Sequence, residues 1–475
     1  MYIDGDWVDA VEGGTFAVTN PATGEGLGSV PDGGSADATR AVDAAAAALP
    51  RWATTTPFER ADLLMAAWRL MTERTADLAA LMTAEQGKPL AAARFEVGYA
   101  ADFLRWFAEE ARRIEGAWLP SAKRGQRFLQ TTAPVGVVAA ITPWNYPVSM
   151  LTRKIGPALA AGCTIVLKPA EATPLCARAV IGVLHDAGIP AGVVNLVTAA
   201  DPAPVGEVFT GDHRVRKLTF TGSTAVGRQL AARAAGNLQR VSMELGGHAP
   251  VIVFPDADPV RTAKGVAALK FLNAGQACIS PNRLYVHRSL TQAFTDTIVP
   301  RVQGLTVGDG SQDGIAVGPL IDEAAVAKVE AQVTDARDKG AGVPVGGHRM
   351  TDAGRDRGHF YAPTVLTGVT TDMTIYTEET FGPVAPIISY DDVDAVIDAA
   401  NDTAYGLAAY VYTRDLSTAL RAVEGLQFGI IGVNDINPTS ASVPFGGMKD
   451  SGVGREGGHE GLHEYLETKV AGISL

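Results

Sequence analysis

Three residues of the sequence combine a reactive side chain with neighbours that form turns. Cys278 follows Gly275 and Gln276, a polar setting in which a thiol can be accessible and nearby donors can lower its pKa. Glu244 precedes a pair of glycines and could act as a general base. Asn145 lies between two prolines and could direct its amide at an oxyanion. Together they provide a nucleophile, a base and an oxyanion donor.

Each of these residues also has an interpretation without chemistry. A lone cysteine is often a small buried hydrophobic residue, and we interpret Cys163 and Cys176 in this way because their neighbours resemble a core. A glutamate before glycines is usually solvated, and an asparagine between prolines usually forms a turn. Taken singly, the three residues therefore establish no function.

Two further segments could bind a ligand that carries phosphate. Gly222 and Ser223 follow a predicted strand and open a helix, whose N-terminus offers backbone N–H groups and the positive end of a dipole. This is not the usual G-x-G-x-x-G pattern. Lys168 and Glu171 come just after another predicted strand, and open α/β sheets bind ligands at that edge.

The elements that must position these residues alternate between strand and helix. Apolar residues recur at helical spacing over 35–113, with a break at 87–89. Short runs rich in β-branched residues then predict strands at 135–141, 164–167, 193–197 and 218–220, and a second such series covers 251–443. This alternation predicts parallel sheets with crossover helices. Residues 123–132 and 465–475 are predicted to be extended. The unpaired backbone groups at the edges of such strands need a partner, for example another subunit.

Composition excludes several classes of protein. The 475 residues carry a formal charge of −12, which disfavours binding to nucleic acid or to an anionic membrane. Only 3 cysteines are present, too few for a disulfide framework, and no apolar stretch is long enough to span a membrane. The N-terminus has acidic residues where a signal peptide would be basic. We therefore expect a cytoplasmic protein without a metal site.

Seven motifs, in this order, resemble those of the aldehyde dehydrogenase superfamily over nearly the whole chain. They are Pro143-Trp144-Asn145-Tyr146-Pro147, Lys168-Pro169-Ala170-Glu171, Phe220-Thr221-Gly222-Ser223, Glu244-Leu245-Gly246-Gly247, Gly275-Gln276-Ala277-Cys278, Glu378-Glu379-Thr380-Phe381-Gly382-Pro383 and Pro444-Phe445-Gly446-Gly447-Met448-Lys449.

The resemblance implies a catalytic role for four residues. Cys278 would add to the aldehyde to give a thiohemiacetal, which Asn145 and the Cys278 backbone N–H would stabilise. Loss of hydride to the nicotinamide would leave a thioester, and Glu244 would activate the water that releases the acid. Lys154 matches a lysine that the family uses to orient the site and relay protons.

The resemblance also implies a nicotinamide cofactor. Lys168 and Glu171 match positions at the adenosine ribose, and Glu379 matches the carboxylate on the nicotinamide ribose. A carboxylate at Glu171 would repel a 2′-phosphate, so we expect NAD, with NADP less favoured. The full set of expected cofactor-binding residues is Thr142, Trp144, Lys168, Glu171, Gly222, Ser223, Leu245, Glu379 and Phe381.

Within the superfamily, local motifs look most similar to those of succinate-semialdehyde dehydrogenases. Arg153 matches the first of two arginines that hold the substrate carboxylate there, whereas Leu272 stands in place of the second. Thr439 is an approximate counterpart of the hydroxyl residue. The expected substrate-site residues are Tyr146, Met150, Arg153, Leu272, Ile279, Thr439 and Phe445. With one arginine missing, a neutral aliphatic or aromatic aldehyde stays an alternative substrate.

The implied fold has a Rossmann-like cofactor domain (1–115 and 135–246), a second α/β catalytic domain (247–447) and a small β oligomerisation element (116–134 and 460–475). Family resemblance suggests a homodimer or homotetramer. Two other functions remain as alternatives: a CoA-acylating enzyme, which Glu244 disfavours because such relatives commonly lack this base, and a non-enzymatic member of the fold, which would be expected to lose Cys278, Glu244 or Asn145.

Overall fold

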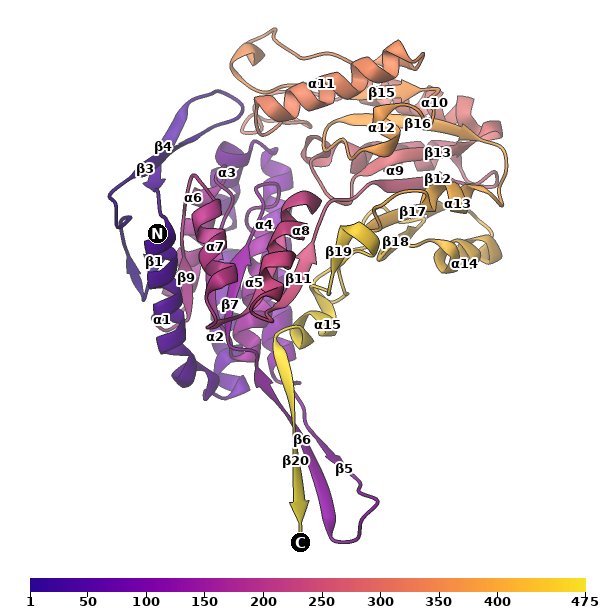
Figure 1. Cartoon of the computed structure of the whole chain (residues 1–475). Helices are drawn as coiled ribbons and strands as arrows, with labels where there is room; N and C mark the ends of the chain where they lie inside the picture. The colour runs from indigo at the N-terminus through magenta and orange to yellow at the C-terminus, as the bar shows by residue number, and fades with distance from the viewer.

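The computed structural model describes all residues, Met1–Leu475, as two α/β domains with a narrow β arm that projects from the first (Figure 1). The first domain is built on an 8-stranded sheet of order β19-β11-β10-β7-β8-β9-β1-β2. Its strands are β1 (Tyr2–Ile3), β2 (Asp6–Trp7), β7 (Val137–Ile141), β8 (Thr164–Lys168), β9 (Val194–Leu196), β10 (Val215–Thr221), β11 (Arg240–Glu244) and β19 (Gly452–Val453). The five central strands, β7 to β11, are parallel. The sequence predicted a parallel sheet with four of these strands, β7 to β10, and missed β11.

Helices cover both faces of this sheet. Side chains alternate along a strand, so Val138 and Ala140 pack in one core and Val137 and Ala139 in the other. The helices are α1 (Ser35–Ala53), α2 (Pro57–Glu73), α3 (Thr75–Gln86), α4 (Leu90–Ala111), α5 (Ser149–Ala161), α6 (Pro174–Asp186), α7 (Ala203–Gly211) and α8 (Thr224–Ala235). The first core holds α2 to α6, and the second holds α1, α7 and α8. The predicted break at 87–89 separates α3 from α4.

The second domain has a 7-stranded sheet of order β14-β15-β16-β13-β12-β17-β18, parallel except for β14. Strand β12 is buried on both faces, which explains its continuous apolar sequence. The elements are β12 (Ala249–Val253), α9 (Pro259–Lys270), β13 (Pro281–His287), α10 (Arg288–Gln303), α11 (Glu323–Asp338), β14 (Gly342–Val345), β15 (Thr364–Thr367), α12 (Thr374–Thr377), β16 (Val384–Tyr390), α13 (Val396–Asn401), β17 (Ala408–Tyr412), α14 (Leu416–Gly425) and β18 (Ile430–Val433).

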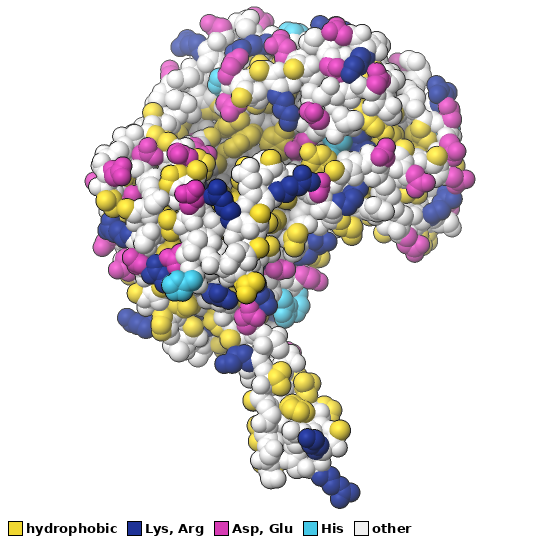
Figure 2. All heavy atoms as spheres, in the orientation of Figure 1, with side chains coloured by type: hydrophobic (Ala, Val, Ile, Leu, Met, Phe, Trp, Pro, Cys, Tyr) yellow, Lys and Arg dark blue, Asp and Glu magenta, His cyan; other side chains and the backbone are white.

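The arm consists of three antiparallel strands, β5 (Ala117–Leu119), β6 (Gln126–Pro134) and β20 (Leu466–Ser474), in the order β20-β6-β5. Figure 2 shows apolar side chains exposed along it. A separate hairpin of β3 (Thr15–Thr19) and β4 (Gly26–Pro31) lies near the N-terminus. No helix combines the length and apolarity that a membrane span requires.

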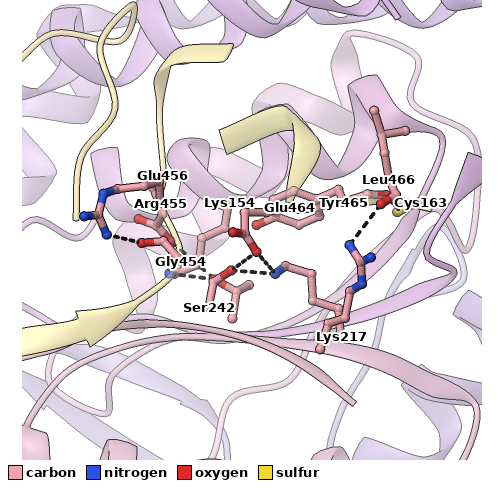
Figure 3. A network of polar contacts seen from close by, with 12 residues as sticks. Lys154, Cys163, Lys217, Ser242, Gly454, Arg455, Glu456, Glu464, Tyr465 and Leu466 are labelled. Carbon is pink, nitrogen blue, oxygen red and sulfur yellow. Dashed lines mark hydrogen bonds and ion pairs between the residues drawn. The ribbon is translucent and has the colours of Figure 1, made fainter. Parts of the chain in front are cut away.

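The chain returns to the first domain before it enters the arm. Strand β19 pairs with β11, and helix α15 (Gly458–His463) packs on α4 and α5. Below this segment, the Lys217 ammonium contacts the Ser242 hydroxyl at 2.5 Å and the Glu464 carboxylate at 3.3 Å (Figure 3). The buried Tyr465 carbonyl accepts a hydrogen bond from the Val135 N–H at 3.0 Å. These contacts fix the root of β20 to the domain body.

Candidate active site

Cys278 lies in a tight loop between α9 and β13. Asn273 and Ala274 both adopt left-handed backbone conformations, with φ of 51° and 54°. Side-chain hydrogen bonds stabilise the loop: the Gln276 amide donates to the Asn273 carbonyl at 3.1 Å. At Gly275, with φ +74°, a Cβ would lie 2.1 Å from the Gly382 carbonyl oxygen, so only glycine fits. The loop therefore holds the half-buried Cys278 thiol in one place.

The Cys278 thiol lies in a setting that favours its protonated form. Burial raises its pKa to about 12, and the nearby carboxylates of Glu379 and Glu244 act in the same direction. The Arg153 guanidinium opposes them. The thiol therefore needs a proton acceptor before it can act as a nucleophile.

Asn145 links the end of β7 to the Cys278 loop. Its side-chain amide donates to the Gln276 carbonyl at 3.1 Å, and its own backbone carbonyl accepts from the Asn273 amide at 3.0 Å. Its side-chain oxygen is buried without a partner. The remaining N–H of the Asn145 amide is thus held beside the reactive loop.

Glu244 ends strand β11, and its side chain is buried. Neither carboxylate oxygen has a hydrogen-bond partner. Burial raises its pKa well above the ordinary value, and the Glu456 carboxylate adds to this effect, while Arg153, Lys154 and Arg455 oppose it. A carboxylate whose pKa is raised in this way is a stronger base than an ordinary glutamate.

Lys154 lies in α5, and its buried ammonium is shared between two acceptors. It contacts Glu456 Oε1 at 2.5 Å and Thr219 Oγ1 at 3.0 Å. Figure 3 shows Lys154 and Glu456 side by side above the sheet. Glu456 was not identified from the sequence as a site residue. Its only signal was its place in the Gly-Arg455-Glu456-Gly segment, which by itself does not indicate a buried acid.

All seven residues expected at the substrate site line one cavity of about 300 Å³ that reaches Cys278. They are Tyr146, Met150, Arg153, Leu272, Ile279, Thr439 and Phe445. Most of the lining is apolar. Leu272 and Phe95 keep 38% and 62% of their surface exposed, so apolar side chains are also available to solvent beside this cavity.

Arg153 contributes a positive charge to the lining of this cavity. Its guanidinium stacks over the Phe445 ring, 4.1 Å from the centroid, and donates to the Tyr99 hydroxyl at 3.2 Å. Its Nε and Nη1 atoms are buried without a hydrogen-bond partner. The Glu456 carboxylate is 3.9 Å away. Nη1 thus forms a long ion pair with Glu456, and the guanidinium brings a positive charge to the lining of the cavity.

A second cavity, of about 270 Å³, approaches Cys278 from the cofactor domain. Six of the expected cofactor residues line it: Trp144, Gly222, Ser223, Leu245, Glu379 and Phe381. The buried Thr221 and Thr380 hydroxyls have no partner, and Glu379 accepts only the Gly247 N–H, at 3.0 Å. Polar atoms left free beside a helix N-terminus suit a nucleotide with ribose and phosphate groups. Cys278 lines both cavities.

The other three expected cofactor residues lie outside this cavity, at the carboxyl ends of β7 and β8. The Thr142 N–H donates to the Lys168 carbonyl at 3.1 Å, and the Lys168 ammonium pairs with the Glu171 carboxylate. Carboxyl ends of parallel strands are the usual ligand-binding edge of such a sheet. Sequence analysis did not identify Lys328, a lysine of α11 that also lines the cofactor-side cavity. No group of three or more His, Cys, Asp or Glu side chains is arranged to hold a metal ion.

Comparison with known proteins agrees with this geometry. The family model described as Aldehyde dehydrogenase family matches residues 7–471. The NADP(+) succinate-semialdehyde dehydrogenase GabD of Escherichia coli strain K12 is 50% identical over 473 residues, covering 100% of this chain and 97% of that protein. A glutarate-semialdehyde dehydrogenase of Pseudomonas putida is 48% identical, covering 100% of this chain and 97% of that protein.

Solved structures show the same fold. The crystal structure of an NADP-dependent enzyme of Escherichia coli superposes with a TM-score of 0.98 at 49% identity, covering 100% of this chain and 98% of that one. An α/β fold with a cysteine between two cavities, matched over its full length in sequence and structure, identifies the chain as a member of the aldehyde dehydrogenase family.

Proposed function

We propose that this aldehyde dehydrogenase oxidises a semialdehyde to a dicarboxylic acid, with NAD as the preferred cofactor. The observation that carries the proposal is the Arg153 guanidinium in the lining of the cavity that ends at Cys278. A substrate carboxylate would pair with this cation while its aldehyde carbon lies at the sulfur. The names of the similar enzymes from Escherichia coli and Pseudomonas putida point to the same class of substrate.

The chain's own residues supply most of the chemistry. A water takes the proton of the Cys278 thiol, and the thiolate adds to the aldehyde carbon, so Glu244 stays unprotonated for the later hydrolysis. The negative charge that develops on the carbonyl oxygen is held by the Asn145 amide and the Cys278 N–H. A bound nicotinamide would supply the hydride acceptor that oxidation of the thiohemiacetal to a thioester on Cys278 requires. Glu244 then deprotonates a water that attacks the thioester, releasing the acid and the free thiol.

The cavity itself supports one alternative substrate. Its lining is mostly apolar, and Leu272 stands where a second arginine would bind the substrate carboxylate. Losing one charge-assisted hydrogen bond costs about 1.5–3 kcal/mol, which is roughly 10- to 150-fold in affinity. A neutral aliphatic or aromatic aldehyde is therefore the second candidate. Transfer to coenzyme A is disfavoured because Glu244 is present as a base for hydrolysis.

A substrate panel distinguishes the two candidates. NADH formation is measured with succinate semialdehyde, glutarate semialdehyde and hexanal, in the wild type and in Arg153→Met. We expect kcat/KM for a semialdehyde to exceed that for hexanal at least about 10-fold, and Arg153→Met to remove the difference. Hexanal outperforming both semialdehydes would overturn the carboxylate assignment. Turnover that persists in Cys278→Ala would overturn the mechanism.

Preference for NAD rests on Glu171. Its side chain is 40% exposed and pairs with Lys168. The Glu171 carboxylate would repel the 2′-phosphate of NADP, because both groups are negatively charged. We expect Glu171→Ser to raise kcat/KM with NADP, relative to NAD, at least about 10-fold, a change that corresponds to 1.4 kcal/mol. An unchanged ratio of kcat/KM with NADP to kcat/KM with NAD would contradict this explanation. The measurement is needed because the similar enzyme of Escherichia coli is named for NADP(+).

A further inference from the structure

A buried lysine outside the predicted site contacts the backbone of Asn145. Lys88 lies in the turn between α3 and α4, and its ammonium is almost fully buried. It donates to the Asn145 carbonyl at 2.8 Å and lies 4.1 Å from the centroid of the Tyr146 ring. It also pairs with the Glu96 carboxylate. Lys88 therefore contacts the Asn145–Tyr146 segment at two points.

The Glu96 carboxylate holds the next part of the same segment. Its Oε1 atom accepts from the N–H groups of Val148 and Ser149, at 3.0 and 3.1 Å. These N–H groups begin α5, which has no side-chain cap of its own at Val148. A carboxylate at a helix N-terminus stabilises the unpaired donors there. Because α5 carries Arg153 and Lys154, Glu96 fixes the start of the helix that delivers both.

The turn that carries Lys88 is itself held by the second domain. The Leu90 N–H donates to the Gly310 carbonyl at 3.0 Å, and a Cβ at Gly318 would lie only 2.1 Å from the Gly87 carbonyl oxygen. The same stretch of the second domain binds Gln276: its amide donates to the Pro319 carbonyl at 3.3 Å. The turn at Lys88 and the Cys278 loop thus both pack against residues 310–319 of the second domain.

From these contacts we propose that Lys88 and Glu96 are positioning residues for the oxyanion site. Lys88 fixes the Asn145 backbone against the Cys278 loop. Glu96 binds both Lys88 and the first N–H groups of α5, and so fixes their positions relative to Asn145. The inference rests on the proposed role of Asn145 as an oxyanion donor. This role is distinct from substrate binding, because the Glu96 carboxylate pairs with the Lys88 ammonium and neutralises its charge.

A buried ion pair is a poor source of stability but a strict geometric constraint. Desolvation of the two charges offsets much of their attraction, so an apolar pair of similar volume would be about as stable. Removing only one partner leaves a buried charge uncompensated. Accurate placement of Asn145 would offset the desolvation of this ion pair, because a displacement of roughly 1 Å in a catalytic donor can lower turnover about 100-fold.

A double-mutant cycle tests the proposal. Lys88→Met, which keeps the length of the side chain, is made in the wild type and in Asn145→Ala, and kcat/KM is measured with NAD and a semialdehyde. We expect about a 10- to 100-fold loss in the wild type and less than about a 3-fold further loss in the Asn145→Ala background. Similar losses in both backgrounds would overturn the proposal. No loss in Asn145→Ala alone would instead overturn the role of Asn145.

A second readout separates positioning from general damage. Alkylation of Cys278 by iodoacetamide needs the thiol but no oxyanion donor, so its rate should stay within about 3-fold of wild type in Lys88→Met. Parallel loss of alkylation and turnover would contradict the proposal. Lys217→Met is the matched control, because Lys217 is equally buried and ion-paired but contacts Glu464 and Ser242. It should lower the melting temperature similarly and leave kcat/KM within about 3-fold.

If Lys88→Met does not fold, Glu96→Gln carries the test. Its side-chain oxygen still accepts from the α5 donors, while the charge that holds Lys88 is lost. We expect about a 10-fold loss of kcat/KM in the wild type, and again almost none in the Asn145→Ala background. An equal loss in both backgrounds would show that Glu96 acts independently of Asn145.

Discussion

The Cys278 thiol has a cation on one side and two carboxylates on others. Burial, Glu379 and Glu244 together raise its pKa to about 12, against the opposing effect of Arg153. Arg153 therefore has two consequences in one position: it presents a positive charge in the cavity that a substrate carboxylate would enter, and it favours the thiolate. A bound anion would weaken the second effect by neutralising the guanidinium.

The dual position of Arg153 leads to a prediction about the free enzyme. Arg153→Met should raise the pKa of Cys278 further and slow alkylation by iodoacetamide at pH 8, because the thiolate fraction falls about 10-fold when the pKa of the thiol rises by one. The same variant should raise KM for semialdehydes more than for hexanal. Alkylation is followed by mass spectrometry against pH. An unchanged alkylation profile would show that Arg153 acts on the substrate alone.

Glu244 gives the prediction for pH dependence. Burial raises its pKa, so the protonated form persists to higher pH, and only the deprotonated form can activate water. Release of the acid should therefore slow as pH falls through this raised pKa. Glu244→Gln should show a burst of one NADH per active site followed by turnover slowed about 100-fold or more, as expected when a general base is removed. Stopped-flow absorbance measures the burst; its absence would show that Glu244 is needed before the thioester forms.

Sequence patterns identified residues whose neighbours in the chain carry the signal. Cys278, Glu244 and Asn145 each stand among prolines or glycines that mark an unusual turn. No such signal marks Lys88, Glu96 or Glu456. The structural role of each depends on a contact with a residue far away in the chain. A buried lysine cannot be told from an exposed one by its type, so these contacts required the structure.

At the scale of elements, the site is assembled from loops at strand ends. The carboxyl ends of β7, β10 and β11 deliver Asn145, Gly222 and Glu244. The sequence predicted strands at β7 and β10, but it predicted no strand before Glu244. The sequence could not predict how the second domain's loop meets them. That contact depends on Gly247, where a Cβ would lie 2.3 Å from the Cys278 carbonyl oxygen.

Close packing at Gly247 gives a prediction with a matched control. Gly247→Ala should displace the Cys278 loop and lower kcat/KM by about 10- to 100-fold, because small shifts of a reacting group are costly. Gly182→Ala, in the middle of α6 with open space around it, should leave kcat/KM unchanged and stabilise the fold by about 0.5–1 kcal/mol. Kinetics and urea denaturation measure the two effects. Wild-type activity in Gly247→Ala would show that the loop can move aside without cost.

At the scale of the whole molecule, the arm is the part without a core of its own. Strand β20 pairs with β6 and leaves its other edge open, and Trp118, Val470 and Leu475 keep 62%, 61% and 88% of their surface exposed. Sequence reasoning predicted both extended segments, but only the structure shows that they pair with each other along nine residues of β20. An open edge with apolar side chains is usually covered by another chain.

We propose that a second copy of the chain covers the arm, and a truncation tests this. Tyr465 and Leu466 belong to the domain body, since their carbonyls accept from Val135 and Arg240, so the cut is placed after Thr468. The full chain should sediment at two or four times 49.5 kDa, and the truncated chain near a single copy, while unfolding stays cooperative. Removing only Leu475 is the control and should leave the mass unchanged. A truncated chain that keeps the full assembly would place the interface elsewhere, because no partner could then depend on the open edge of β20.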